Sequence, residues 1–305
     1  MRAATNNTAL TLSLLLAVFL WGGSNAGTKF MVARWPPIWT GSSRFLCAGL
    51  LLLAILRFTN WFGAAHPLTA ATRRRLWLRG GSSLAAYIVA FNWALRHTSV
   101  SHVALYLGAA PVWALLWERP PARSWHTIQR YSAAALALAG VFVLNQPALK
   151  LGGGSWLGEA LGLAASVLWT NYSRQCRALS AELSGSEISA HTMWRAGLWL
   201  LPLAAVEVCQ KGLLWRADLA WVQSYCIVVG GVVTFALWNR AMRFWPASQV
   251  LLFNNLIPLS TMSWAYVWLG EPITPTFWVA MLLVMAGVLL GQAVICQRPL
   301  VTEDQ

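Results

Sequence analysis

The chain has 305 residues, of which 58% are hydrophobic and only 10% are charged. Soluble globular domains carry about 25% charged residues, so this composition excludes a soluble protein. A net charge of +13 would suit nucleic-acid binding in a soluble chain, but here it indicates the basic cytoplasmic loops of a membrane protein. The densest basic run, Arg73–Arg75, adjoins a hydrophobic segment and lacks the interleaved aromatic residues that bind bases. At about 20 residues per helix, the length allows about ten crossings of a bilayer.

Apolar segments follow one another along the chain, separated by loops rich in proline, glycine and arginine. Inside lipid, backbone N–H and C=O groups must be paired within their own element, so each segment is predicted to be a helix. The ten predicted spans are residues 9–29, 38–58, 76–96, 101–117, 126–145, 156–174, 188–208, 221–243, 248–269 and 275–296. The predicted fold class is therefore an all-α membrane protein.

The N-terminal segment admits two interpretations. Arg2, the apolar run 10–21 and the small residues 24–26 are typical of a cleavable signal peptide. A retained first helix is favoured because Leu20-Trp21 recurs in the sixth segment as Leu168-Trp169. The five cysteines are scattered and have no metal-ligand spacing. Neither a metal site nor a cofactor is predicted.

Lysine and arginine fall unevenly in alternate loops, and this bias indicates orientation. Fourteen lie on one side: Arg2, Arg57, Arg73, Arg74, Arg75, Arg79, Arg119, Arg123, Arg130, Arg174, Arg177, Arg240, Arg243 and Arg298. Six lie on the other: Lys29, Arg34, Arg96, Lys150, Lys211 and Arg216. Arg44 and Arg195 lie within predicted spans. The bias predicts a multi-pass protein of the inner membrane with both termini in the cytoplasm.

The chain contains an internal repeat at an offset of 147 residues, which aligns residues 85–145 with residues 232–292 without a gap. Fourteen of the 61 positions are identical, against about five expected from so biased a composition. The identical pairs include polar residues and proline: Asn92/Asn239, Arg96/Arg243, Ser101/Ser248 and Pro111/Pro258. The predicted domains are residues 1–147 and 148–305. Because each holds five spans, the second must enter the membrane from the opposite side, as in many secondary transporters.

Several motifs resemble the drug/metabolite transporter superfamily. They are Leu20–Gly23, Arg44-Phe45, Arg195, Pro111, Pro258, Leu269–Pro272 and Ala286–Val288. Within the superfamily, the chain is similar to the ten-helix EamA-type exporters, and most closely to the YddG-type exporters of aromatic and other amino acids. The resemblance implies a 5+5 inverted-topology repeat around a central cavity, formed by the third, fourth, eighth and ninth spans with help from the first and sixth. One departure is the Gly-Glu-Pro turn at 270–272, which has no copy in the first half.

Polar residues inside spans are costly in lipid, so they usually face a partner helix or a water-filled cavity. The asparagines that we predict to line the cavity are Asn92, Asn239, Asn254 and Asn255. Their amides can hold both the carboxylate and the ammonium of a zwitterion, although hydrogen bonding between helices is the alternative explanation. Pro111 and Pro258 each remove one backbone hydrogen bond, which predicts a loosened turn, usable as a hinge, in the fourth and ninth spans.

Aromatic residues and one histidine complete the predicted cavity: Trp21, Tyr87, His102, Tyr106 and Trp169. Trp21 and Trp169 occupy matched places in the first and sixth spans. His102 fits a hydrogen-bonded interfacial position better than the role of a proton carrier. Glu271 is predicted to be a turn residue that caps the start of the last span. No Asp or Glu lies deep in any predicted span. This argues against the proton exchange that small multidrug members of the superfamily perform with a buried glutamate in their first helix.

These observations predict a secondary transporter that exports amino acids, including aromatic ones, and related small metabolites by alternating access. The expected partners are the small-molecule substrate and the lipid bilayer, with no nucleic acid, and a monomer should suffice because the chain carries both repeat orientations. The main alternative is an exporter of drugs or other metabolites. A membrane-embedded enzyme or a lipid scramblase is a further alternative, but the spans offer no nucleophile–base set or paired carboxylates, so no catalytic residue is predicted.

Overall fold

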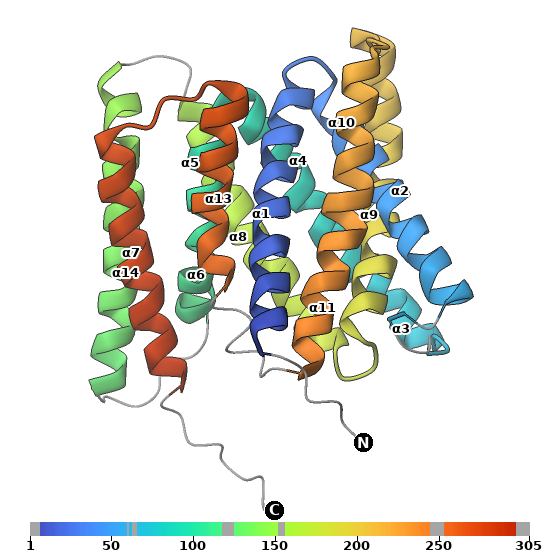
Figure 1. Cartoon of the computed structure of the whole chain (residues 1–305), viewed down its shortest axis with the longest axis horizontal. Helices are drawn as coiled ribbons and strands as arrows, with labels where there is room; N and C mark the ends of the chain where they lie inside the picture. Colours follow the sequence, from blue (N-terminus) through green and yellow to red (C-terminus); the bar gives the residue numbers. More distant parts are fainter. Residues whose placement is uncertain are drawn as a thin grey trace, which may run out of the picture.

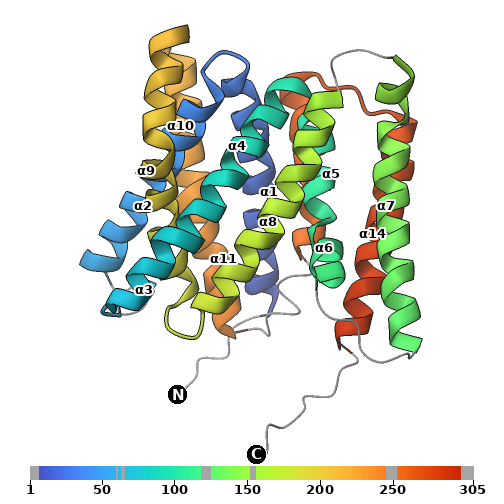
Figure 2. The same cartoon turned by 180° about the vertical axis from the view of Figure 1, so that it is seen from behind.

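The structure is a computed structural model that describes residues 7–59, 61–62, 66–117, 125–151, 156–244 and 253–296. Within these ranges every regular element is a helix, which confirms the predicted all-α class (Figures 1 and 2). The elements are α1 (Asn7–Val32), α2 (Pro37–Phe58), α3 (Ala70–Arg75), η1 (Leu76–Gly81), α4 (Ser82–His97), α5 (Val100–Gly108), α6 (Ala110–Trp117), α7 (Trp125–Leu151), α8 (Trp156–Leu179), α9 (Gly185–Lys211), α10 (Ala217–Val228), η2 (Val229–Val233), α11 (Thr234–Phe244), η3 (Phe253–Leu256), α13 (Ile257–Trp264), η4 (Ala265–Leu269) and α14 (Pro275–Cys296).

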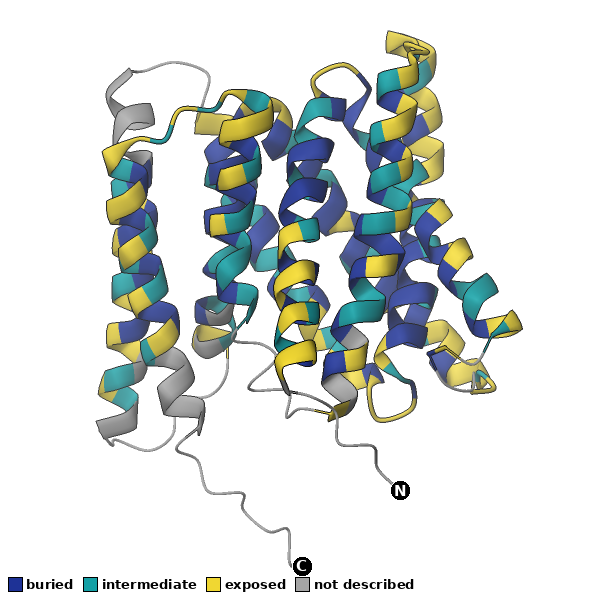
Figure 3. Cartoon of the chain, in the orientation of Figure 1, coloured by how far each residue is buried: buried dark blue, intermediate teal, exposed yellow. Residues whose placement is uncertain are grey.

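The helices turn apolar side chains outward as well as inward, as lipid contact requires. Phe142, Val267 and Leu282 are among the large apolar side chains that the bundle exposes. Figure 3 shows buried residues concentrated where the helices face one another. In the described ranges, four stretches are long and apolar enough to cross a membrane: Thr8–Val32, Pro37–Phe58, Thr127–Leu144 and Ala217–Trp238. These stretches support a multi-pass membrane protein, whereas the count of ten spans stays a prediction.

α1 lies in the middle of the bundle, packed against α13 on one side and against α10 and α11 on the other (Figure 1). α2 packs along α9 at one end of the molecule, and α7 packs along α14 at the other. On the opposite face, α8 packs along α4 and against α5 and α6 (Figure 2). The contact of α1 with α10 and α11, the first predicted span with the eighth, therefore has a counterpart in the contact of α8 with α4, the sixth with the third.

Gly140 of α7 and Gly287 of α14 make equivalent close contacts. A Cβ atom on Gly140 would lie 2.7 Å from the carbonyl oxygen of Ala280, and a Cβ atom on Gly287 would lie 2.6 Å from that of Ala133. The two glycines are 147 residues apart, and so are the two alanines. The interface between α7 and α14 is thus self-complementary, like an interface between two copies of one surface.

α2 and α9 approach each other in the same way. A Cβ atom on Gly49 would overlap the backbone nitrogen of Trp194, and a Cβ atom on Gly197 would lie 2.6 Å from the Cβ atom of Leu46. Both pairs of equivalent residues are separated by 148 positions. The two helices therefore touch backbone to backbone, and neither glycine has room for a side chain.

Two helices begin just before a proline, at positions 147 residues apart. α6 begins one residue before Pro111, and α13 begins one residue before Pro258, so each missing N–H falls in a first turn, where no hydrogen bond is lost. The preceding residues have similar backbone angles, with φ −80° and ψ −2° at Ala109 and φ −86° and ψ −11° at Leu256. The structure interrupts both spans at the turns where the sequence predicts loosening. Their use as hinges stays a prediction.

The prediction that Glu271 caps the start of the last span is wrong. Its carboxylate accepts hydrogen bonds from the backbone N–H of Val100 at 2.9 Å and from the hydroxyl of Ser101 at 3.0 Å, and so it caps α5. α14 is capped instead by the Thr274 hydroxyl, which accepts from the N–H of Phe277 at 3.2 Å. The physical reason is that packing brings the turn before α14 to the N-terminus of α5, which lies 171 residues away in the chain.

Candidate functional site

Arg44 of α2 places a positive charge inside the bundle, facing α1. Its terminal nitrogens donate hydrogen bonds to the hydroxyls of Thr28 at 2.7 Å and Ser24 at 2.8 Å. Gly230 of η2 borders the same space, where a Cβ atom would lie 3.5 Å from the guanidinium. Within the described ranges no carboxylate pairs with Arg44. An intramembrane arginine without an acidic partner makes binding of an anionic substrate group the first hypothesis.

Aromatic rings occupy equivalent positions on the two sides of the bundle interior. The rings of Trp169 and Tyr87 lie 4.9 Å apart between α8 and α4, and those of Trp21 and Phe235 lie 5.5 Å apart between α1 and α11. Both members of one pair are 148 residues from those of the other, one more than the offset of the gapless repeat, which aligns Tyr87 with Thr234, the neighbour of Phe235. Tyr87 lies within electrostatic reach of Arg44. The matched tryptophans of the prediction therefore each contact an aromatic ring of a neighbouring helix.

Glu159, in the first turn of α8, is buried with 5% of its surface exposed. Its carboxylate accepts hydrogen bonds from Nδ1 of His102 at 2.9 Å and from the hydroxyls of Tyr106 and Thr98. The ring of Tyr106 lies against Gly162, where a Cβ atom would come within 2.6 Å of the ring. The structure thus brings two of the predicted site residues, His102 and Tyr106, together on one buried carboxylate.

The predicted asparagines have different surroundings. The Asn92 amide donates to the carbonyl of Pro37 at the start of α2, at 2.8 Å, and only 1% of the residue is exposed. Asn92 therefore serves helix packing in this conformation. Asn254 is half-buried and Asn255 is buried, both in η3 just before α13. The side chains of Asn239 and of the predicted hinge residue Pro111 lie outside the part of the chain that the structure describes.

Arg44 and Glu159 are candidate site residues that were not predicted from the sequence. The signal for Arg44 is a cation in an otherwise apolar segment whose partners, Ser24 and Thr28, share one face of the preceding helix. The signal for Glu159 is its alignment with Ser166 and other small or polar residues on one face of α8. Glu159 lies near the start of its apolar segment, which suggested an exposed position. It is buried because neighbouring helices cover the first turn of α8.

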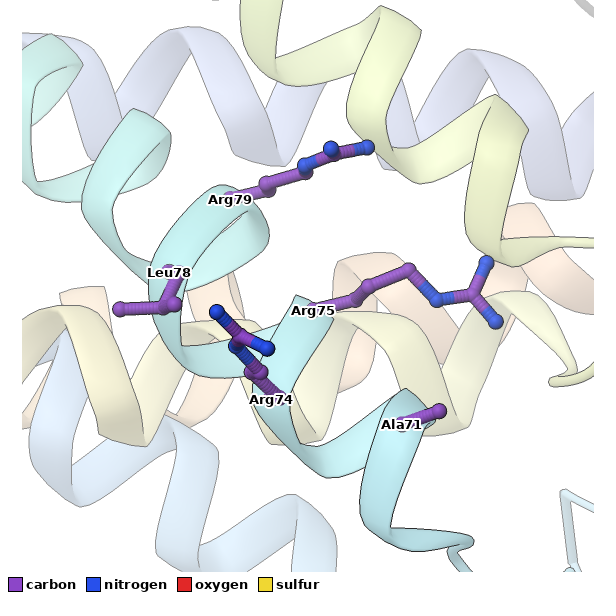
Figure 4. Close-up of a pocket in the computed structure, with 5 residues that line it drawn as sticks. All are labelled: Ala71, Arg74, Arg75, Leu78 and Arg79. Carbon is purple, nitrogen blue, oxygen red and sulfur yellow. The ribbon is translucent and has the colours of Figure 1, made fainter.

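Two surface pockets lie at the α3 end of the bundle, and neither contains a predicted site residue. One has a volume of about 410 Å³ and is surrounded by Ala71, Arg74, Arg75, Leu78 and Arg79 (Figure 4). The other is lined by His66, Pro67, Thr69, Ala71, Thr72, Arg75, Glu182 and Leu183. Tyr87 and Tyr106 are buried. In this conformation these two predicted cavity residues pack between helices.

Residues 9–146 and 156–291 of the chain match the EamA-like transporter family. The "Probable terminal-alkyne amino-acid exporter" of Streptantibioticus cattleyicolor is 26% identical over 286 residues, which cover 91% of each chain. The "Uncharacterized transporter YwfM" of Bacillus subtilis is 24% identical over 304 residues, which cover 93% of each chain. A crystal structure that is 18% identical superposes with a TM-score of 0.58, covering 96% of this chain and 100% of its own, and so shares the fold. The chain belongs to the EamA-like transporter family.

Proposed function

We propose that this protein exports amino acids, including aromatic ones, and related small metabolites across the inner membrane by alternating access. Its ten spans form two inverted five-helix repeats, residues 1–147 and 148–305, with both termini in the cytoplasm, and a monomer suffices. Family membership supports transport. The name of the Streptantibioticus relative supports an amino-acid cargo.

The observation that carries the substrate class is the guanidinium of Arg44 inside the bundle. A guanidinium binds a carboxylate through paired, charge-assisted hydrogen bonds, and its bonds to Ser24 and Thr28 leave further N–H donors for that purpose. The same charge repels a cationic drug. The nearby ring pair of Trp169 and Tyr87 offers an apolar surface for the substrate side chain. Zwitterionic cargo fits these groups better than organic cations do.

The equivalent contacts of the two halves support the inverted repeat. Glycines 147 or 148 residues apart meet equivalent partners at the α7–α14 and α2–α9 interfaces, and the two interrupted spans break at equivalent positions. The two stretches that match the family divide the chain at the same place. Alternating access follows if each half moves about its interrupted span while the substrate stays between them.

Counterflow in proteoliposomes tests the proposal directly. Vesicles loaded with one unlabelled amino acid should take up the same labelled amino acid faster than empty vesicles do. Nucleosides and cationic dyes serve as comparison cargoes in the same preparation. Trans-stimulation by amino acids is the expected result. Stimulation by dyes alone would instead establish the drug-exporter alternative, and no stimulation by any cargo would contradict transport by exchange.

Reporter fusions test the orientation. Fusions after Gln305 and within the Arg73–Arg75 segment should report a cytoplasmic location, and a fusion near Gly153 should report an external one, because the basic residues collect on the first side. Paired cytoplasmic and periplasmic reporters at each site provide the control. An external C-terminus would be incompatible with ten spans.

Asn254 and Asn255 are proposed to receive the substrate ammonium, together with carbonyls of the loosened turn before Pro258. Asn254→Leu and Asn255→Leu should each lower counterflow several-fold with normal insertion. Leu259→Ala, an exposed position on α13, is the control and should behave as wild type. Loss of insertion would favour a packing role for the asparagines. Unchanged counterflow in both variants and in the double variant would move the site toward Trp21 and Trp169.

A further inference from the structure

One face of α8 carries a row of small and polar residues that runs along α5 and α6. Glu159, Gly162, Ser166 and Thr170 follow at intervals of three or four residues, so they lie on one side of the helix. All four are buried. Polar groups buried inside a membrane protein need partners, and the interrupted span formed by α5 and α6 supplies them.

Glu159 is the ionisable member of this row. Its titratable partner is His102, whose Nδ1 lies 2.9 Å from the carboxylate and whose side chain is 28% exposed, against 7% for that of Glu159. Within the described ranges no lysine or arginine pairs with Glu159. A proton added to Glu159 would remove a charge that is costly to bury and that no permanent cation balances.

The rest of the row links Glu159 to the interruption of the fourth span. The Ser166 hydroxyl donates to the carbonyl of Tyr106, and the Thr170 hydroxyl donates to that of Ala110 at 3.1 Å. Tyr106 therefore contacts the row twice: its hydroxyl donates to Glu159, and its carbonyl accepts from Ser166. A change at the carboxylate acts directly on the helix that ends where α5 passes into α6.

The contact between α1 and α13, in the part of the chain that the structure describes, differs from this arrangement. At the offset of 148 residues that relates Trp21 to Trp169, the positions of α1 that match Glu159, Ser166 and Thr170 are Thr11, Val18 and Gly22, and none of these side chains is ionisable. Ser260 and Trp264 of α13 donate to the carbonyl of Phe19 at 3.3 and 3.0 Å, much as Trp113 of α6 donates to the Ser166 hydroxyl of α8 at 2.9 Å. The two interrupted spans are alike in backbone, and the first is joined to a titratable group through the hydroxyl of Tyr106.

We propose that Glu159, paired with His102, is the proton site that couples transport to the proton gradient, an inference that rests on the proposed export function. The ionised carboxylate holds α5 against α8 through His102 and Tyr106. A proton taken up from the outer side adds to a carboxylate oxygen, removes the charge that orders these donors and loosens α5. The proton leaves on the inner side in exchange for outward movement of the substrate. Only the O–H bond of the acid is made and broken.

The other described charged and titratable groups around the pair have their own partners. Lys29 of α1 donates to the carbonyls of Leu95 and Thr98 at 2.7 and 2.8 Å. On α4, Arg96 donates to the carbonyl of Val32 and His97 stacks on Trp93. Glu271 caps α5. α6 carries no titratable side chain, and the charged side chains of α7 lie outside the described part. Lys29 and Glu271 hold the turn between α4 and α5 whatever the state of Glu159.

Glu187 provides a matched control. Like Glu159, it is a buried carboxylate in a first helical turn, with the Nδ1 atom of a histidine, His66, at 2.9 Å. It closes the capping box of α9 with Ser184 and touches none of the proposed site residues. What separates Glu187 from Glu159 is its place in the fold: its hydrogen bonds come from Ser184 and His66 and not from the interrupted span of α5 and α6. Glutamine in this position can still complete the cap.

Proton-driven accumulation is the first test. Proteoliposomes receive an acidic interior and external labelled amino acid, with the membrane potential clamped by potassium and valinomycin. Wild-type protein should accumulate substrate, up to about tenfold for a gradient of one pH unit at one-to-one exchange. Glu159→Gln should lose accumulation, so that uptake stops at equal concentrations, whereas Glu187→Gln should accumulate as wild type does. Equal accumulation by wild type and Glu159→Gln, or none by wild type in vesicles that show counterflow, overturns the proton site and leaves the proposed function standing.

A second measurement needs no substrate. Infrared difference spectra of the reconstituted protein, recorded between about pH 5 and pH 8, should show a protonated-carboxyl band that Glu159→Gln lacks and Glu187→Gln keeps. Tyr106→Phe removes one donor to the ionised carboxylate and keeps the ring on Gly162, so it should move the midpoint of that band to higher pH. Identical spectra of wild type and Glu159→Gln over this range would overturn the proposal, even if counterflow of every amino acid were absent and the proposed function had failed.

Discussion

Arg44→Leu is expected to lower amino-acid counterflow at least tenfold. A hydrogen bond to a charged group contributes roughly 1.5–3 kcal/mol, which corresponds to a factor of about 10 to 150 in affinity. The guanidinium is replaced by an apolar group of smaller size, so Ser24 and Thr28 lose the donors that they accept from, and the substrate carboxylate loses its counter-charge. Counterflow measured over a range of substrate concentrations separates lost binding from slower exchange.

The control for Arg44 is Arg57→Leu, which removes an exposed arginine from the last turn of the same helix and should leave counterflow unchanged. Cargo chemistry gives a sharper control. An amine that lacks the carboxylate of the parent amino acid has nothing to offer the guanidinium, so any transport of it should not fall when Arg44 is replaced. If amino acid and amine lose transport equally, Arg44 supports the helices and does not bind the carboxylate.

Gly49→Val is expected to cause the largest loss of stability among single substitutions at helix contacts. Its side chain would overlap the backbone of α9 at Trp194, where no side chain can turn aside, and overpacking costs about 1–3 kcal/mol or more. The midpoint of thermal unfolding in detergent should fall by at least about 5 °C. Gly197→Val, at the equivalent contact, should have an effect of similar size because Leu46 approaches it in the same manner.

Cys47→Val is the matched control for Gly49→Val. It introduces the same side chain two residues earlier in α2, on the exposed face, and should leave the unfolding midpoint within about 1 °C of wild type. A Gly49→Val protein as stable as wild type would mean that α2 and α9 do not pack backbone to backbone.

Sequence patterns predicted local features of this fold better than contacts across it. Apolar segments give helices because lipid leaves no other way to pair the backbone, and Pro111 and Pro258 locate the interruptions through a purely local effect. The capping of α5 by Glu271 depends on a contact across 171 residues, and no local pattern encodes it. The partner of a side chain across the bundle is fixed by helix packing, which the hydrophobic pattern leaves open.

The candidate site, too, could be predicted from the sequence only in part. Trp21 and Trp169 were found because the repeat relates them, and their ring contacts are equivalent in the structure. Arg44 and Glu159 were not predicted to belong to the site, because the repeat has no residue of the same type at the equivalent positions. Residues that break the repeat are harder to find from one sequence, although an asymmetric task such as binding a carboxylate or a proton requires them.

The contact between α7 and α14 has a consequence for the origin of the chain. Gly140 and Ala133 have identical counterparts in Gly287 and Ala280, so Gly140 in one copy of a half-length polypeptide could meet Ala133 in another copy as it now meets Ala280. A polypeptide that consisted only of the first half would therefore already have a surface able to pair with the same surface of an inverted second copy. Duplication and fusion of the gene for such a polypeptide would preserve this pairing while freeing each half to acquire residues, such as Glu159, that the other does not share.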